Sequence, residues 1–328
     1  MEKILKEGWG ITPDEINVVQ SNVWKIREGR RYYALKESTL KERNLTFICE
    51  VERGLPDHGF FGFAPLIPAE NGRLYFVKGN RFFSLHRWLF GEHCDFTNTD
   101  HLFACARTLG EFHLRVGMPD LQKKFPNRCR YFQRGEQMIK KRRELADFRC
   151  RAEAEKQKGG NRLYCAYFPD VDATAERAID SLYASDYHRL AAEAMSVGAL
   201  IHYDVAARNF IMMPKEAFFI DFDYCCFDLP MTDLMRLCKR SLKHGPPYEE
   251  KLRAIIEGYG SVRPLTVAEG KILCAMVSFP QKLWRLAHRH YVEGYFENDG
   301  IYAKKLCDAL DEWEREKDWF PLLAERWK

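Results

Sequence analysis

Two carboxylates and one amide in the sequence have the types and spacing to hold a metal ion and to move a proton. Asp204 stands five positions before Asn209, and Asp221 follows the next two apolar runs. Carboxylate and amide oxygens suit a hard cation such as Mg²⁺, which takes few protein ligands and keeps water and phosphate oxygens in its shell. We therefore expect Asn209 and Asp221 to share a Mg²⁺ ion, and Asp204 to act on a hydroxyl group. Asp223 is expected beside the metal, as a second ligand or as hydrogen-bonding support for Asp221.

A predicted β-hairpin explains how these side chains would meet. Residues 210–213 and 217–220 are apolar runs, and Pro214-Lys-Glu216 between them is typical of a turn. Because Asn209 precedes the first run and Asp221 follows the second, closing the hairpin brings both to the same end. Asp204 lies on the loop that leads into the hairpin.

The spacing is that of a kinase active site, in which H-x-D-x-x-x-x-N is followed by D-F-x. His202, Asp204 and Asn209 supply the first pattern, and Asp221 opens the second. In this scheme Asp204 orients or deprotonates the attacking hydroxyl, while Asn209 and Asp221 hold metal on the nucleotide phosphates. His202 is expected to pack and hydrogen-bond so that the loop keeps its shape. The alternative is a loop with a few capping residues, which explains either pattern alone but not the two together.

A lysine near the N-terminus matches a second part of such a site. Lys36 ends the run Tyr-Ala-Leu-Lys, which is similar to the V-A-I-K strand whose lysine pairs nucleotide phosphates. Its ion-pair partner should lie on a predicted helix at residues 40–55. Glu50 and Glu52 are both candidates there, and the sequence does not choose between them.

The phosphate-binding loop expected before that lysine contains no glycine. Ser21 and Asn22 stand where the loop should turn. Their hydroxyl and amide groups could bind phosphate in place of backbone N–H groups, or the two residues could form an ordinary turn. The sequence does not choose between phosphate binding and an ordinary turn.

The wider chain reads as an α+β fold in two parts. Short strands around one helix occupy residues 1–90, which we interpret as a nucleotide-binding lobe. Long helical patterns occupy residues 91–328, which we interpret as a helical lobe for catalysis and acceptor binding. The stretch 128–162 is rich in Arg and Lys, and is either a solvated helical face or a surface that receives an acidic substrate or partner.

Composition excludes several classes of protein. The 328 residues have a net charge of only +4, so the strongly basic surface of a nucleic-acid-binding protein is not expected. No apolar run reaches the roughly 18 residues of a membrane-spanning helix, and the charged start MEKILKEGWG lacks a signal peptide. The 11 cysteines are scattered, which indicates reduced thiols in a reducing compartment.

Departures from the protein-kinase pattern favour a small-molecule kinase. Ala206 stands where protein kinases usually have Lys or Arg, the triad is Asp-Phe-Asp, and no Ala-Pro-Glu follows. The chain resembles the aminoglycoside phosphotransferase and choline kinase superfamily, and more narrowly the CotS-like spore-coat proteins. The motifs that carry this resemblance are His202-Tyr-Asp-Val-Ala-Ala-Arg-Asn-Phe210, Asp221-Phe-Asp223, Asp233-Leu234, Leu109-Gly-Glu-Phe-His113, Ser21-Asn-Val-Trp-Lys25 and Ser84-Leu-His-Arg-Trp88.

This resemblance implies a bilobal protein-kinase-like fold that uses ATP and Mg²⁺. It also implies assembly with the spore coat in the mother-cell cytoplasm, with other coat proteins as partners. From composition, neither nucleic acid nor a membrane is expected as a partner. The phosphoryl acceptor would be a small molecule or a coat component that the family name does not reveal. The alternative is a kinase-fold structural protein of the coat without turnover.

Overall fold

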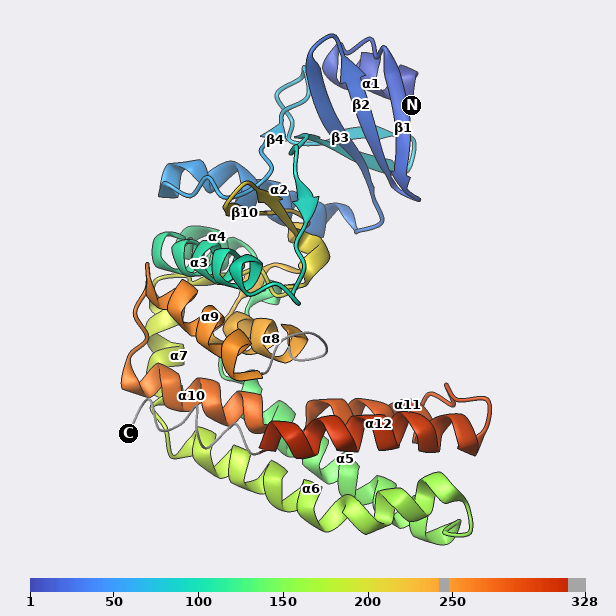
Figure 1. The fold of residues 1–328 in the computed structure, drawn as a ribbon. Helices are drawn as coiled ribbons and strands as arrows, with labels where there is room; N and C mark the ends of the chain where they lie inside the picture. Colours follow the sequence, from blue (N-terminus) through green and yellow to red (C-terminus); the bar gives the residue numbers. More distant parts are fainter. Residues whose placement is uncertain (242–247, 318–328) are drawn as a thin grey trace. The chain divides into compact units, whose positions relative to one another are not determined.

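Antiparallel strands dominate the N-terminal part of the chain and helices dominate the rest, so the predicted α+β class is confirmed (Figure 1). The computed structural model describes residues 1–241 and 248–317. Packing divides the chain into two units. The first consists of Met1–Cys129, Val197–Phe227 and Ala254–Arg263, and the second of Arg130–Ser196, Asp228–Arg253 and Pro264–Lys328. This division does not coincide with the lobe boundary expected after residue 90, which stays a prediction.

A six-stranded antiparallel sheet forms the core of the first unit. Its strands are β1 (Glu15–Gln20), β2 (Val23–Glu28), β3 (Arg31–Ser38), β4 (Leu66–Ile67), β5 (Phe76–Lys78) and β6 (Arg81–Arg87). The order is β1-β2-β3-β6-β4, with β5 also paired to β6. Lys36 lies opposite Val23 on β2 and Ser84 on β6, so strands flank it on both sides.

Two helices belong to this part of the first unit. The N-terminal helix α1 (Glu2–Trp9) buries Leu5 against Leu35 and Phe83 of the sheet. Because side chains alternate along a strand, Lys36 lies on the face opposite Leu35. The helix expected at residues 40–55 is confirmed as α2 (Glu42–Gly54). Neither α1 nor β1 was predicted from the sequence pattern.

The predicted hairpin is confirmed as β9 (Phe210–Met213) and β10 (Glu216–Phe219). The strands are antiparallel, and Phe210 lies opposite Phe219. The rest of this unit consists of β7 (Glu92–His93), α3 (Thr99–Arg115), α4 (Pro119–Lys124), β8 (Leu200–Ile201), β11 (Cys226–Phe227) and residues 254–260 of α9 (Tyr248–Gly260), with short 3-10 turns. β7 pairs with the other edge of β9, and β11 with β8.

Buried aromatic rings hold the hairpin against α3. The ring of Phe112 on α3 lies 5.2 Å from that of Phe60, 5.7 Å from that of Phe219 and 6.2 Å from that of Phe222. All four side chains are buried. These contacts fix the ends of the hairpin, where the candidate site residues lie.

The substitution Phe112→Ala should lower the free energy of unfolding by about 3–5 kcal/mol, because it removes a buried ring from this cluster. Leu114→Ala on the same helix is the matched control, since Leu114 is 59% exposed. The control should stay within about 0.5 kcal/mol of wild type. Chemical denaturation measures both, and equal losses would show that the cluster does not stabilise the unit.

The second unit is helical. Its helices are α5 (Gln133–Ala154), α6 (Gly159–Tyr183), α7 (Tyr187–Ser196), α8 (Met231–Ser241), α10 (Val267–Ser278), α11 (Gln281–Tyr291) and α12 (Asp299–Lys317), with the first residues of α9 (Tyr248–Gly260). One hydrophobic cluster joins α5, α6, α11 and α12. No helix within the described residues is long and apolar enough to cross a membrane.

Candidate active site

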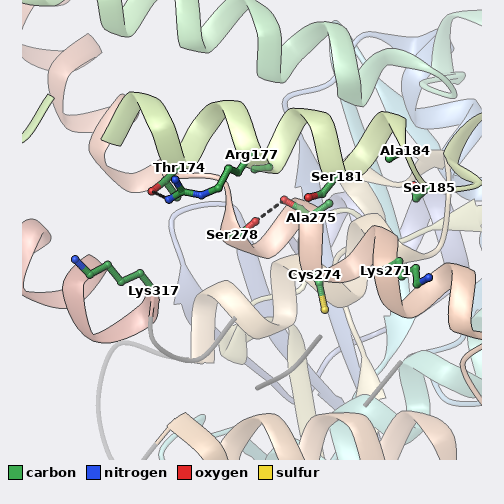
Figure 2. A pocket seen from close by; sticks show the side chains of 11 residues that line it. Thr174, Arg177, Ser181, Ala184, Ser185, Lys271, Cys274, Ala275, Ser278 and Lys317 are labelled. Carbon is green, nitrogen blue, oxygen red and sulfur yellow. Dashed lines mark hydrogen bonds between the residues drawn. The ribbon is translucent and has the colours of Figure 1, made fainter. Parts of the chain in front are cut away.

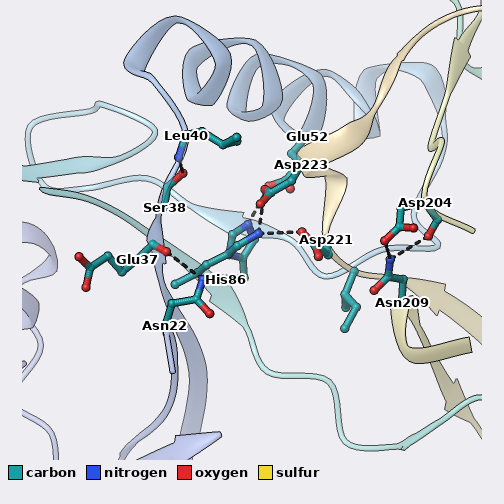
Figure 3. A network of polar contacts seen from close by, with 12 residues as sticks. Asn22, Glu37, Ser38, Leu40, Glu52, His86, Asp204, Asn209, Asp221 and Asp223 are labelled. Carbon is teal, nitrogen blue, oxygen red and sulfur yellow. Dashed lines mark hydrogen bonds and ion pairs between the residues drawn. The ribbon is translucent and has the colours of Figure 1, made fainter. Parts of the chain in front are cut away.

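The loop after β8 carries Asp204, whose carboxylate is held by two neighbours (Figure 3). The amide Nδ2 of Asn209 donates to the backbone oxygen and to Oδ2 of Asp204, at 2.7 Å in both cases. Nη2 of Arg208 donates to the same Oδ2 at 3.2 Å. Asp204 and Asn209 are both buried. Since the Asn209 nitrogen is committed to Asp204, its Oδ1 is the amide atom left for a metal ion.

His202 fixes this loop to the end of the hairpin. Its side chain is fully buried, and Nε2 lies 3.1 Å from the backbone oxygen of Ile220. Its ring stacks on Phe219, with centroids 4.6 Å apart. His202 therefore holds this loop against Ile220, the residue before Asp221, through the packing and hydrogen bonding expected for it.

Closing the hairpin brings Asn209 and Asp221 to the same end, as the sequence predicted. The backbone N–H of Ile220, the residue directly before Asp221, donates to the backbone oxygen of Asn209 at 3.0 Å. Asp221 and Tyr203 each have a φ of 66°, a left-handed conformation that costs energy for residues other than glycine and is common at functional sites. The shared Mg²⁺ ion stays a prediction.

Lys36 extends from β3 to two carboxylates of this segment. Its Nζ lies 2.7 Å from Oδ1 of Asp221 and 2.7 Å from Oδ1 of Asp223. Burial alone would lower the pKa of Lys36, but Asp223 and Asp221 together raise that pKa above its ordinary value. Burial raises the pKa of Asp223, helped by Asp221 and Glu52 and opposed by Lys36. The three charged groups therefore form one ion-paired network, whose carboxylates Asp221 and Asp223 are labelled in Figure 3.

The prediction that Lys36 pairs with Glu50 or Glu52 is wrong in this structure. Lys36 instead has two carboxylate partners in the segment after β10, Asp221 and Asp223. Glu52 is buried, and its Oε2 lies 2.8 Å from Nε2 of His86 on β6. His86 was not identified as a site residue, although its place in the strand next to that of Lys36 is a signal that the sequence contained.

Glu50 pairs with other side chains of the first unit, and not with Lys36. Its carboxylate forms an ion pair with Arg53 one turn along α2, and Lys124 approaches it to 3.8 Å. Nothing in these contacts connects Glu50 with the nucleotide role expected for it.

The Ser21–Asn22 turn follows the ordinary-turn alternative. The two residues connect β1 to β2 directly, because Gln20 lies opposite Val23. Nδ2 of Asn22 donates to the backbone oxygen of Glu37 on β3 at 3.1 Å, so this amide nitrogen supports the sheet, and phosphate binding by Ser21 and Asn22 stays a prediction. Ser21 is exposed at the tip of the turn.

A cavity of about 540 Å³ lies in the second unit between α6 and α10 (Figure 2). Arg177, Lys271 and Lys317 supply its charge, and serine, threonine, alanine and cysteine side chains complete the described lining. No carboxylate is among these residues, so the cavity lacks the general base and the metal ligands that the predicted chemistry needs.

The structure has the fold of the kinase-like phosphotransferases. An aminoglycoside phosphotransferase from Alicyclobacillus acidocaldarius matches it with a TM-score of 0.86 and 19% identity, over 99% of this chain and 96% of that protein. The amicoumacin kinase hAmiN, solved with AMP-PNP and Ca²⁺, matches with a TM-score of 0.61 and 14% identity, over 94% of this chain and 92% of that one. At these identities the likeness establishes the fold.

The family model described as "Spore coat putative kinase YutH" matches residues 2–320, and the chain belongs to that family. Spore coat protein S of Bacillus subtilis is 20% identical over 285 residues, which are 83% of this chain and 77% of that protein. The resemblance to spore-coat proteins is thereby confirmed, and the fold is that of the aminoglycoside phosphotransferases.

Proposed function

We propose that the chain is an ATP- and Mg²⁺-dependent phosphotransferase that moves the γ-phosphoryl group to a hydroxyl of its acceptor. The observation that carries this proposal is the arrangement at the end of the β9–β10 hairpin. Asp204 is held by Asn209 on one side, and Lys36 joins Asp221 and Asp223 on the other. Phosphoryl transfer by kinases needs these groups: a carboxylate for the acceptor, oxygen ligands for the metal and a lysine for the phosphates.

The donor set fits Mg²⁺ and a nucleotide. Asp221 and Asn209 offer hard oxygen donors, which Mg²⁺ prefers to nitrogen or sulfur. No group of three or more His, Cys, Asp or Glu side chains arranged to hold a metal occurs among residues 1–241 and 248–317, so this site depends on one amide and its neighbouring carboxylates. When bound, Mg²⁺ neutralises charge on the phosphate oxygens.

Each residue then has a separate task. Asp204 accepts a hydrogen bond from the acceptor hydroxyl and takes its proton as transfer proceeds. Asn209 and Arg208 fix the orientation of that carboxylate. Lys36 exchanges part of its pairing with Asp221 and Asp223 for the phosphate oxygens, to which its ammonium group is attracted.

The family supports a role in the spore coat, with the protein made in the mother-cell cytoplasm. Its acceptor is a small hydroxyl compound or a component of the coat, and other coat proteins are its expected partners. A coat protein without turnover is the second candidate, and the glycine-free turn whose Asn22 amide supports the sheet favours it.

The test combines nucleotide binding with a screen of hydroxyl compounds for ADP release. The proposal predicts that wild-type protein binds ATP with Mg²⁺ and that one class of acceptor increases ADP release. If the protein neither binds ATP with Mg²⁺ nor releases ADP, the phosphotransferase proposal is contradicted and a coat protein without turnover is favoured.

Replacing Lys36 tests its role directly. Lys36→Met should weaken binding of ATP at least tenfold, because the phosphates lose a cation. It should also lower the free energy of unfolding by about 1–3 kcal/mol at neutral pH, because Asp221 and Asp223 then face each other without a counter-charge. Lys41→Met is the control, since Lys41 is an exposed lysine of the same unit.

The free energy of unfolding of Lys36→Met should depend on pH in a definite direction. The pKa of Asp223 is already raised in the folded protein, and loss of the lysine raises it further. The folded variant then binds protons more tightly than the unfolded chain, so its stability increases as the pH falls toward the unfolded pKa. The difference in free energy of unfolding between Lys36→Met and wild type should therefore become smaller as the pH falls. A difference that grows in acid would contradict the proposed network.

A further inference from the structure

Cys94 and Cys105 bring two buried thiol groups into contact within the first unit. Their sulfur atoms lie 3.0 Å apart. Both residues are buried, with 5% of the surface of Cys94 exposed and none of that of Cys105. All 11 cysteines of the chain lie within residues 1–241 and 248–317 and are free thiols. The contact is therefore one between two reduced side chains that tertiary packing has brought together.

Backbone contacts hold Cys94 at the edge of the β9–β10 hairpin. Cys94 directly follows β7, whose His93 lies opposite Ile211 of β9. The backbone N–H of Cys94 donates to the backbone oxygen of Phe210 at 3.0 Å. The main chain at Cys94 thus continues the pairing of β7 with β9, and the sheet determines where its side chain starts.

Cys105 lies on α3, and the start of this helix is fixed by a side-chain cap. Oδ1 of Asn98 accepts hydrogen bonds from the backbone N–H groups of Asp100 and His101, at 2.9 and 3.3 Å. Nδ1 of His101 accepts a hydrogen bond from the backbone N–H of Asp95, the residue after Cys94, at 3.1 Å. The loop between the two cysteines is therefore bonded to the helix, and a sheet edge and a helix present the thiols to each other.

We propose that Cys94 and Cys105 are a modification site, at which a small organic disulfide oxidises the pair to an intramolecular disulfide bond. Such a bond is about 2.0 Å long, so the two sulfurs need to approach each other by about 1 Å. The bond ties α3 covalently to the segment that pairs with β9. This inference does not depend on phosphoryl transfer by the first unit.

The reaction balances with one molecule of the oxidant, R–S–S–R. The thiolate of Cys94, the more accessible of the two, attacks one sulfur of the oxidant, breaks its S–S bond and releases R–SH once the leaving sulfur takes a proton. Cys105 then loses its proton, attacks the sulfur of Cys94 and releases the second R–SH. Two electrons and two protons pass from the cysteine pair to the oxidant. Burial raises the pKa of Cys105 well above its ordinary value, helped by the hydrogen bond with Cys94, which suits Cys105 to the second, intramolecular step.

The test treats the native full chain with cystamine, a small organic disulfide. The protein carries Cys150→Ser and Cys307→Ser, because these two exposed cysteines would otherwise join separate molecules. Free thiols are then alkylated in denaturant, and trypsin releases residues 88–107 as one peptide that contains both cysteines. Mass spectrometry should find this peptide without alkyl groups and lighter by two hydrogen atoms. A peptide with two alkyl groups, or one that keeps cysteamine on Cys94 without closing the bond, would overturn the proposal.

Single variants in the same protein test the two steps. Cys105→Ala should stop the reaction after the first step, so that Cys94 retains a cysteamine group. Cys94→Ala should leave Cys105 reduced and fully alkylated. Cys49→Ala is the matched control, since Cys49 is another buried cysteine of the first unit, and it should still form the bond. A cysteamine group on Cys105 in Cys94→Ala, or a bond from either cysteine to any other one in the parent protein, would overturn the proposal.

Discussion

Asp204→Asn should reduce acceptor-dependent ADP production by about 10²–10⁴-fold, the usual contribution of a general base. The amide cannot take the proton of the acceptor hydroxyl. The change leaves the shape of the side chain nearly intact, and an amide oxygen can still accept the hydrogen bonds that Asn209 and Arg208 donate. Affinity for ATP with Mg²⁺ should stay within about twofold of wild type, because the proposed role of Asp204 does not include holding the nucleotide.

The measurement pairs ADP production with nucleotide affinity for the same protein samples. Asp57→Asn is the control, because Asp57 is an exposed aspartate of the first unit far along the chain from the loop. It should behave as wild type in both assays. A loss of nucleotide binding in Asp204→Asn would show that this carboxylate belongs to the metal site. Unchanged ADP production would remove Asp204 from the mechanism.

Asp221→Asn should weaken binding of ATP in the presence of Mg²⁺ by about 10–100-fold, since it removes a formal charge worth about 1.5–3 kcal/mol from the metal's ligands. The fold should tolerate the change, because Asn adopts the left-handed conformation of Asp221, with φ 66°, as readily as Asp does. The affinity for ATP without Mg²⁺ should not fall. Lys36 pairs with Asp221 at 2.7 Å, and the substitution leaves that lysine less tightly engaged.

Titrations with and without Mg²⁺ separate this result from general damage to the site. Loss of affinity only in the presence of Mg²⁺ is the expected pattern. Equal losses in both conditions would assign Asp221 to the structure of the loop instead of to the metal.

Local sequence patterns predicted the parts of the site that depend on neighbouring residues. The apolar runs around Pro214 determine the β9–β10 hairpin, so the meeting of Asn209 and Asp221 at one end followed from the sequence. The run that ends at Lys36 likewise gave a strand, and its lysine reaches the predicted aspartates. Alternation and turn residues are short-range signals, and a single sequence contains them in full.

The ion-pair partners of Lys36 and Glu52 depend on tertiary packing, and the sequence pattern did not predict them. The choice between Glu50 and Glu52 for Lys36 failed because Asp221 and Asp223 hold the lysine. Glu52 is instead paired with His86, which comes from another strand. Such partners depend on which side chains the sheet and the helix bring together, and helical spacing alone does not contain that information.

The roles proposed for Lys36, Asn209 and Asp221 all require that the first unit bind a nucleotide together with a metal ion. The decisive measurement is a calorimetric titration of the wild-type chain with ATP, in the presence of Mg²⁺ and then with the metal removed by chelation. We expect saturable binding of one ATP per chain with Mg²⁺, and binding at least tenfold weaker without it. The absence of ATP binding under both conditions, or equal affinity with and without Mg²⁺, would contradict the proposed metal–nucleotide site.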